Sequence, residues 1–282
     1  MPLPPTIRFP RARRRPCPSR LATATALLLA SVLLLASALA MAALPPAAAP
    51  GPRQLVVVTT TDWDASDGLL RHYERAGPGA PWRQVGGFAV SIGREGAAWG
   101  EGLHAAQDQD DGPVKREGDG RSPAGMFAIG EAFGYLPAAR VTTPLPYVQM
   151  DAGHYCMDVP DSPLYNRIVH QDEVGAAAVA GSTEPMRLDL HRDGDPRYRL
   201  GLVIGHNPGN RPGGGSCIFA HLWRHPGEAT SGCTAMAEAD MRQLQAWLDP
   251  AAMPRFVLLP RAQYQRLAVQ WRLPAPAPAP TP

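Results

Sequence analysis

The sequence lacks the short motifs that mark several common chemistries, and each absence narrows what the protein can do. No two of its four cysteines form a C-x-x-C pair, so a thiol-redox protein is disfavoured. No H-E-x-x-H pattern is present, which argues against a helical metalloprotease site. The glycine-rich run EGDGRSPAG does not end in G-K-[ST], so it predicts a turn, with substrate contact as the alternative, rather than a phosphate-binding loop.

Positive charge is scarce beyond the N-terminus. The first twenty residues contain six arginines and no acid. Of the 27 Lys and Arg in the chain, 21 remain after these six, against 25 acids, which gives a net charge near −4. No basic stripe with interleaved aromatic residues survives in this remainder. A nucleic-acid partner is therefore not expected.

The N-terminal pattern is typical of export, because arginines precede an uncharged stretch rich in Leu and Ala. Residues 1–43 are predicted to be a signal peptide or an N-terminal membrane anchor. Ala38-Leu39-Ala40 offers a cleavage site, whereas the apolar stretch from Leu21 to Ala43 is long enough to span a bilayer. Both outcomes place the rest of the chain in the periplasm or cell envelope, with possible retention at the inner membrane.

The part that can fold is predicted to be a single, mainly β domain over residues 53–272, with a few helices and a β-sandwich or mixed sheets. A Pro/Ala-rich linker at 44–52 precedes it, and a disordered Pro/Ala tail at 273–282 follows it. The 28 Gly and 32 Pro of the chain favour loops over long helices. Short segments rich in β-branched or aromatic residues predict strands at Leu55 to Thr60, Gln84 to Ile92, Met126 to Ile129, Arg199 to Gly205, Ser216 to His221 and Phe256 to Leu259.

Two helices are predicted. After Met236, the run AEADMRQLQAWL places Met241, Leu244 and Leu248 at i, i+3 and i+7. A second helix is predicted from Asp67 to Arg75, with Ser66 as its cap.

The segment IFAHLWRHPGEATSGCTAM, residues 218–236, holds the candidate chemistry. It places His221 at the end of an apolar run and Cys233 in a turn of small residues. A free thiol with a pKa of about 8.5 is mostly protonated at neutral pH, so a nucleophilic cysteine needs a nearby imidazole to take its proton. Gly232 leaves the neighbouring amides unobstructed, as an oxyanion site requires. The expected position of Cys233, between a strand and a helix, would let helix-end amides help to stabilise a thiolate.

These residues resemble the signature of the L,D-transpeptidases of the YkuD type, in which a histidine is followed by a Ser/Thr, His, Gly, Cys run. His221 matches the family histidine, Thr230 the Ser/Thr, Gly232 the glycine and Cys233 the nucleophile. Ser231 stands where the family usually has a second histidine. The match therefore implies the general chemistry and leaves the substrate open.

The resemblance extends beyond that signature. The segment KREGDGRSPAGMFAIG, residues 115–130, is similar to the glycine-rich turn and Ser-Pro-x-Gly strand of the same enzymes. With Tyr165-Asn166 and the run from Tyr198 to Asn207, the likeness covers roughly residues 53–272. Ala235 departs from the arginine that is usual at its position. A divergent branch of the family is thus implied.

The resemblance implies an acyl transfer on peptidoglycan stem peptides. Cys233 would attack the carbonyl on the L-centre of the third stem residue, with Gly232 and Cys233 amides at the oxyanion, and protonated His221 would help the terminal D-alanine leave. Thr230 and Ser231 are candidates for orienting the imidazole. An amine would resolve the thioester in a transpeptidase, and water in an L,D-carboxypeptidase or amidase-like hydrolase; a non-catalytic peptidoglycan-binding module of the same fold is a further alternative. No metal or organic cofactor is implied.

The remaining cysteines suggest one disulfide. Cys17 lies in the export segment, which leaves three cysteines in an oxidising compartment. Pairing of Cys156 with Cys217 would leave Cys233 free, whereas a bridge between Cys217 and Cys233 would abolish its chemistry; the sequence leaves both open.

Three more side chains are candidates for the substrate cleft: Trp223, His206 and His225. Zinc binding by His206, His221 and His225 is disfavoured, because Pro226 prevents helical presentation of the last two and no glutamate accompanies them.

Overall fold

A computed structural model describes residues 51–275, so the predicted export segment and most of the predicted tail lie outside the described residues. The strands are β1 (Gln54–Thr60), β2 (Asp67–Glu74), β3 (Arg83–Ser91), β4 (Ala97–Trp99), β5 (Ser122–Gly134), β6 (Tyr147–Gln149), β7 (His154–Cys156), β8 (Ile168–His170), β9 (Glu184–Pro185), β10 (Leu200–Ile204), β11 (Phe219–Leu222), β12 (Thr234–Met236) and β13 (Arg255–Pro260). The helices are α2 (Gln171–Val174), α3 (Ala176–Val179), α4 (Leu188–His191), α5 (Glu238–Trp247) and α6 (Arg261–Leu267). Between residues 51 and 275, no helix is long and apolar enough to cross a bilayer.

The larger sheet closes on itself. Its strands follow the order β10, β11, β12, β3, β2, β1, β13 and β5, and β5 pairs again with β10. Strands β4 and β6 add to β5 outside this ring. In this ring β1 pairs with β13 and β11 with β12 in parallel, and the other neighbouring strands are antiparallel. The predicted mainly β domain with mixed strand directions is confirmed, but the expected sandwich is wrong, because one closed sheet replaces two stacked sheets.

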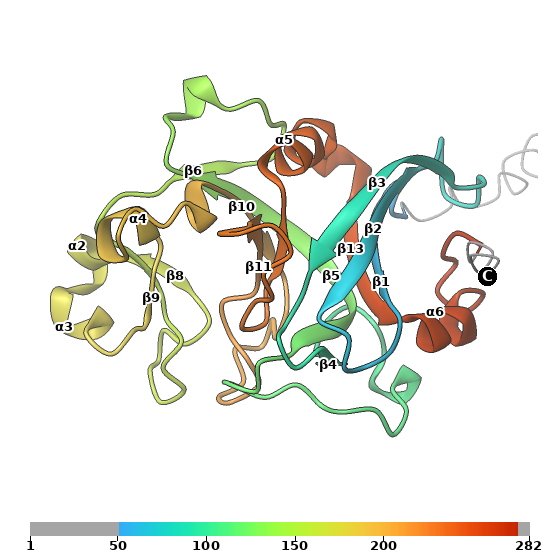
Figure 1. Ribbon diagram of the computed structural model, residues 1–282, viewed down its shortest axis with the longest axis horizontal. Helices are drawn as coiled ribbons and strands as arrows, with labels where there is room; N and C mark the ends of the chain where they lie inside the picture. Colours follow the sequence, from blue (N-terminus) through green and yellow to red (C-terminus); the bar gives the residue numbers. More distant parts are fainter. Residues whose placement is uncertain (1–50, 276–282) are drawn as a thin grey trace, which may run out of the picture. The chain divides into compact units, whose positions relative to one another are not determined.

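The core of this closed sheet explains the apolar run at the start of the domain. Leu55, Val56, Val57 and Val58 of β1 are each at most 2% exposed. A strand that is apolar at consecutive positions must be covered on both faces. One face of β1 points into the closed sheet, and α6 packs near the other, beside β13 (Figure 1).

The six predicted strands are found, with shifted ends. The largest shift is at β5, which runs from Ser122 to Gly134 rather than from Met126 to Ile129. β11 begins at Phe219 rather than Ser216, because Cys217 adopts a left-handed conformation with φ 55° that no regular strand permits. The sequence patterns missed β2, β4, β12 and the short strands β6 to β9.

The predicted helix from Asp67 to Arg75 is wrong, since this segment is the strand β2. Its backbone pairs with β1 on one side and β3 on the other, and these two ladders outweigh a weak local helix preference. Ser66 does not cap a helix; its carbonyl accepts the amide of Ile92.

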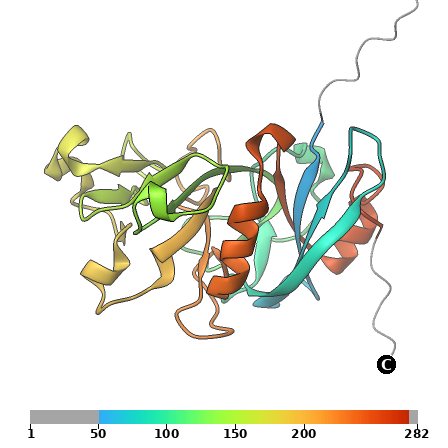
Figure 2. The same ribbon diagram turned by 90° about the horizontal axis from the view of Figure 1, so that it is seen from above.

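The second predicted helix is confirmed as α5. Met241, Leu244 and Leu248 are at most 1% exposed and belong to the main core, as their spacing predicts. Burial of such side chains stabilises the fold by about 1.5–3 kcal/mol each. Figure 2 shows α5 lying against β10 and β11, next to the strands that carry the candidate chemistry.

A smaller lobe, residues 150–197, contains the three-stranded sheet β8-β7-β9 and helices α2 to α4 (Figures 1 and 2). A disulfide between Cys156 of β7 and Cys217 joins the lobe to the segment before β11. A second apolar cluster lies where the lobe meets the closed sheet, and its members are Phe133, Met150, Cys156, Met186, Leu188, Tyr198, Cys217, Phe219 and Cys233.

The folded region extends slightly beyond its predicted ends. Leu273 was expected in the tail, yet it is 8% exposed and packs in the main core. The hydroxyl of Tyr264 donates to the carbonyl of Pro274 at 2.8 Å. The domain therefore includes the first residues of the predicted tail.

Candidate functional site

Cys233 is a free thiol within the second apolar cluster. It lies directly before β12 and is 9% exposed. The amide of Phe219 donates to its sulfur at 3.3 Å, and the thiol donates to the carbonyl of Cys217 at 3.5 Å. Burial raises the pKa of Cys233 to about 12, and nearby Glu184 adds to this effect. Cys233 is therefore a buried neutral thiol in this conformation, rather than the thiolate that nucleophilic attack requires.

The position of Cys233 also differs from the expected strand-to-helix turn. The three-residue strand β12 separates it from α5, which begins at Glu238. Because the field of a helix end fades within about one turn, α5 does not stabilise a thiolate at Cys233.

His221 lies on β11, the parallel neighbour of β12, and is 3% exposed. Its Nδ1 lies 2.7 Å from the carbonyl oxygen of Leu222. A carbonyl only accepts, so Nδ1 carries the proton and the lone pair of the neutral ring is on Nε2. Burial lowers the pKa of His221 to about 4, partly offset by the bond to Leu222. The ring is thus a neutral imidazole at pH 7, in the tautomer that a base at Nε2 requires.

The register of β11 and β12 brings His221 and Cys233 to the same face. Ala220 lies opposite Thr234 and His221 opposite Ala235, so the alternation of side chains places His221 and Cys233 on one side of the pair. Within the described part of the chain, no hydrogen bond joins the two side chains. The two side chains therefore face the same side of these strands without a hydrogen bond between them.

Thr230 and Ser231 do not orient the imidazole, because the carbonyl of Leu222 holds Nδ1. The hydroxyl of Thr230 instead donates to the carbonyl of Cys233 at 2.6 Å and accepts the amide of Gly232 at 3.1 Å. Ser231 is exposed and accepts from Arg94 at 3.2 Å. These residues fix the shape of the turn, while the histidine is held by its own strand.

The backbone conformation explains why position 232 is a glycine, and an oxyanion site does not. Its φ is +154°, and a Cβ there would lie 3.1 Å from the carbonyl oxygen of Arg121. Since its amide already donates to Thr230, the predicted role as an oxyanion donor is not met in this conformation.

Ser122 is a supporting residue that the sequence patterns did not single out. Its hydroxyl donates to the carbonyl of Cys233 at 3.0 Å and accepts the amide of Gly93 at 2.9 Å. Ser122 lies in the run EGDGRSPAG, so this run forms a turn that supports Cys233 from β5.

Two further residues surround the pair. The ring of Tyr198 lies 5.3 Å from that of His221 and 5.5 Å from that of Phe219. The hydroxyl of Tyr198 donates to the half-buried carboxyl of Glu184 on β9. Burial raises the pKa of Glu184, and it lies close enough to raise that of Cys233. No pattern in the sequence predicts that the lobe brings Glu184 here.

The remaining candidates lie elsewhere. His206 is buried, its Nε2 donates to the carbonyl of Gly214 at 3.0 Å, and burial lowers its pKa to about 4. Trp223 donates to the hydroxyl of Ser91 at 2.9 Å, and His225 is exposed. Among residues 51–275, none of these three side chains hydrogen-bonds to Cys233 or His221. The group of potential metal ligands found there contains none of His206, His221 and His225.

The predicted disulfide between Cys156 and Cys217 is confirmed, with Cα atoms 5.9 Å apart, and the alternative bridge from Cys217 to Cys233 is wrong. Asn166 explains the geometry at this point, because its side-chain oxygen accepts the amide of Cys217 at 3.0 Å. The Tyr165-Asn166 pair therefore stabilises the loop before β11: Tyr165 bonds to Glu117 and accepts the amide of Gly215.

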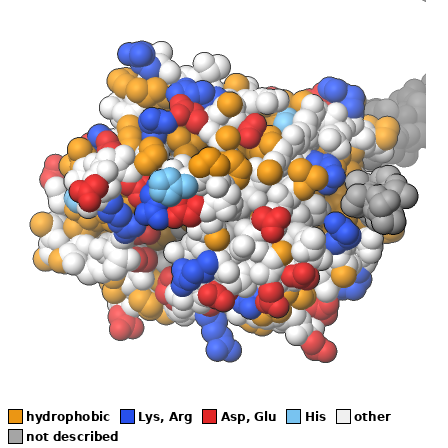
Figure 3. Space-filling model, viewed as in Figure 1, with side chains coloured by type: hydrophobic (Ala, Val, Ile, Leu, Met, Phe, Trp, Pro, Cys, Tyr) orange, Lys and Arg blue, Asp and Glu red, His pale blue; other side chains and the backbone are white. Residues whose placement is uncertain are grey.

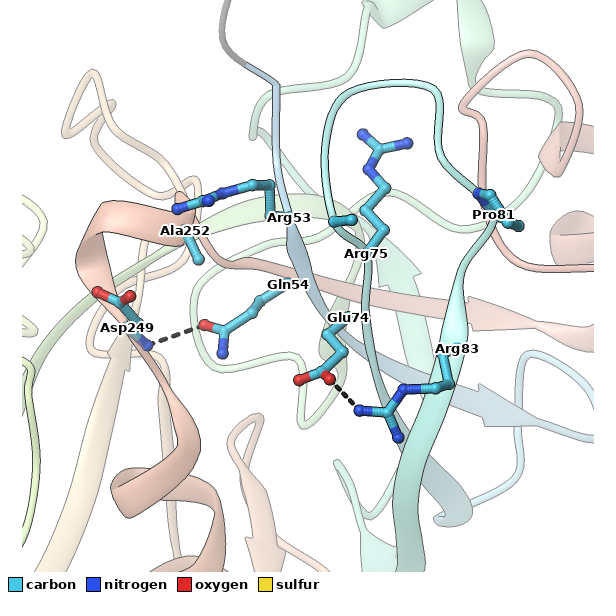
Figure 4. Close-up of a pocket in the computed structure, with 9 residues that line it drawn as sticks. Arg53, Gln54, Glu74, Arg75, Pro81, Arg83, Asp249 and Ala252 are labelled. Atoms are coloured by element: carbon cyan, nitrogen blue, oxygen red, sulfur yellow. Dashed lines mark hydrogen bonds and ion pairs between the residues drawn. The ribbon is translucent and has the colours of Figure 1, made fainter.

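A separate surface cavity of about 490 Å³ is lined by charged residues at the far end of β3 (Figure 4). Arg83, the first residue of β3, pairs there with Glu74, whereas Ser91 at the other end lies opposite Ala235, two residues after Cys233. The cavity is therefore remote from the candidate pair. On the face in Figure 3, acidic and basic side chains are interspersed.

In comparisons with known proteins, no family model, no curated protein and no solved structure matches this chain. The structure itself defines a mainly β domain with a closed sheet and a disulfide-linked lobe.

Proposed function

We propose that this protein is a cysteine acyltransferase of the L,D-transpeptidase type that acts on peptidoglycan stem peptides outside the cytoplasm. The observation that carries the proposal is the placement of a free Cys233 beside a histidine whose Nδ1 is held by a carbonyl. That arrangement supplies a thiol and a base in the correct tautomer from adjacent strands. The disulfide elsewhere in the domain supports an oxidising compartment.

In the proposed reaction, His221 Nε2 takes the thiol proton as the Cys233 sulfur attacks the carbonyl of the third stem residue. The bond from that carbonyl carbon to the nitrogen of D-alanine breaks, and the leaving amine receives the proton. A second stem's amine then attacks the thioester and regenerates the thiol. Water at this last step would make the protein an L,D-carboxypeptidase.

Burial sets a condition on this chemistry. A stem peptide reaches Cys233 only if the apolar contacts between the lobe and the closed sheet open. Water and substrate groups that enter would lower the desolvation that holds the pKa of Cys233 at about 12. The proposal therefore includes movement of the lobe before attack.

A tetrapeptide stem incubated with the protein, followed by intact-mass measurement, tests the reaction. We expect an acyl adduct on the wild type, none on Cys233→Ala, and a rate at least about 10³-fold lower in that variant. Ser231→Ala is a matched control in the same turn and should keep the adduct. Product masses distinguish transfer to an amine from transfer to water.

A non-catalytic stem-binding module of the same fold is the second candidate, favoured by the buried neutral thiol. It predicts that the wild type binds muropeptides without adduct or turnover and that Cys233→Ala binds them equally well. That result would refute the acyltransferase.

A further inference from the structure

Asp151, His154 and His170 bring three potential ligand atoms together on the lobe. His154 of β7 and His170 of β8 are directly opposed across an antiparallel pair, and their ring centroids are 4.7 Å apart. Asp151 precedes β7, and its Oδ1 lies 2.9 Å from Nδ1 of His154 and 3.0 Å from Nε2 of His170. One ligand atom from each residue lies within 4.8 Å of the others.

We propose that these three residues bind a divalent transition-metal ion of the Zn²⁺ class. Imidazole nitrogen with carboxylate oxygen is a ligand set that this class prefers. Ligand atoms about 2.0–2.1 Å from a tetrahedral ion are about 3.3 Å from each other. The two nitrogen–oxygen distances of 2.9 and 3.0 Å fall short of that spacing by only a few tenths of an ångström, so small side-chain movements admit the ion.

The surroundings of these residues fit an ion that would replace the protons now shared between Asp151 and the two histidines. Asp151 is 58% exposed at its side chain, which leaves the site open to solvent. A Cβ on Gly153 would meet His170 Nε2 at 2.4 Å, so glycine at this position is what allows the ring to approach Asp151. Histidine side chains are visible on the lobe side of the surface in Figure 3.

A second carboxylate lies next to His170, on the side away from Asp151. Asp172 Oδ2 lies 3.8 Å from His170 Nδ1. In this structure His170 Nδ1 accepts the backbone amide of Asp172 at 3.2 Å. When His170 Nε2 binds a metal, the ring proton moves to Nδ1, and the side chain must exchange this amide contact for an acceptor, a role that carboxylates commonly fill. The nearby Arg187 does not oppose the ion strongly, because two hydrogen bonds of 2.8 Å pair it with Asp189.

Three protein ligands leave at least one coordination position for water, so the ion is bound at the surface and exchanges with solvent. The ligands come from the turn before β7, from β7 and from β8. A bound ion would therefore fasten these short elements together and stabilise the lobe.

Metal-free protein, prepared by dialysis against a chelator, is titrated with ZnCl₂ in a calorimeter. We expect one site per chain and a rise in Tm on binding. Affinity should fall more than about 100-fold in Asp151→Ala and His170→Gln, and about 10-fold in Asp172→Asn. The control His191→Ala, an exposed histidine of the same lobe, should bind like the wild type.

Equal Zn²⁺ affinity of the wild type and the ligand variants, or no binding by the wild type, overturns the proposal. If a ligand variant does not fold, chemical modification of histidines in the wild type tests the metal site instead. Zn²⁺ should protect His154 and His170 from diethyl pyrocarbonate and leave His191 reactive. Modification of all three at unchanged rates refutes the site.

Discussion

The closed sheet and the lobe are built in different ways. The closed sheet has strands of up to 13 residues and a core of large apolar side chains. The lobe has strands of two or three residues and helices of four, and it relies on a disulfide and on polar contacts. Long ladders stabilise themselves through many cooperative contacts, whereas short elements depend on what they pack against. The candidate pair lies where the two regions meet.

Removal of the disulfide should have the largest effect. Cys156 and Cys217 are 61 residues apart, and opening a loop of this size costs about 4 kcal/mol in the free energy of unfolding. We expect the double variant Cys156→Ser/Cys217→Ser to lose amide protection mainly at β7, β8 and β9. Hydrogen exchange with mass spectrometry measures this, and equal losses in β1 and β13 would contradict the comparison.

A matched pair of leucines measures the same difference in packing. Leu258 of β13 and Leu188 of α4 are both fully buried. We expect Leu258→Ala to lower the free energy of unfolding by about 3 kcal/mol. Leu188→Ala should cost less, because four-residue α4 can shift to fill the space. Urea unfolding of both variants checks this, and a larger loss at Leu188 would mean that the lobe is the more rigidly packed region.

The pH dependence of the free energy of unfolding tests whether the junction between the lobe and the closed sheet is sealed from water. His221 has a pKa near 4 in the folded state, below its ordinary value of 6.5, so its contribution to stability is complete above pH 6.5 and is lost as the pH falls toward 4. Between pH 7 and pH 5, protonation of His221 lowers the free energy of unfolding by about 2 kcal/mol.

His221→Gln should be less sensitive to pH over that range by about this amount, while the exposed His225→Gln should behave like the wild type. Chemical denaturation at each pH supplies the values. If His221→Gln keeps the full wild-type slope, water already reaches the imidazole and the junction is not sealed.

The sequence patterns predicted the closed sheet better than the lobe. β1, β10 and β13 are compact apolar runs, and α5 has a clear helical period, so local signals agree with the tertiary contacts. β2 was mistaken for a helix because only its two partner strands determine it. The elements of the lobe are too short for any period to be visible.

The candidate site was predicted in part for the same reason. Residue type and spacing along the chain singled out Cys233 and His221, and they offered the bridge from Cys156 to Cys217 as one of two pairings. The burial of Cys233 does not follow from residue type and spacing, because it depends on lobe residues such as Met186 and Glu184 that are distant in sequence. The roles of Leu222 and Ser122 arise from a backbone carbonyl and a cross-chain hydroxyl, which leave no residue pattern.

One pair of neighbouring strands in the closed sheet is joined by very few backbone contacts. β12 and β3 share a single paired position, Ala235 opposite Ser91, whereas β2 and β3 pair along nearly their whole length. A ring parts most easily where the fewest backbone bonds hold it. Cys233 lies two residues from this pairing, so the rate at which a thiol reagent labels it would measure how often β12 and β3 separate.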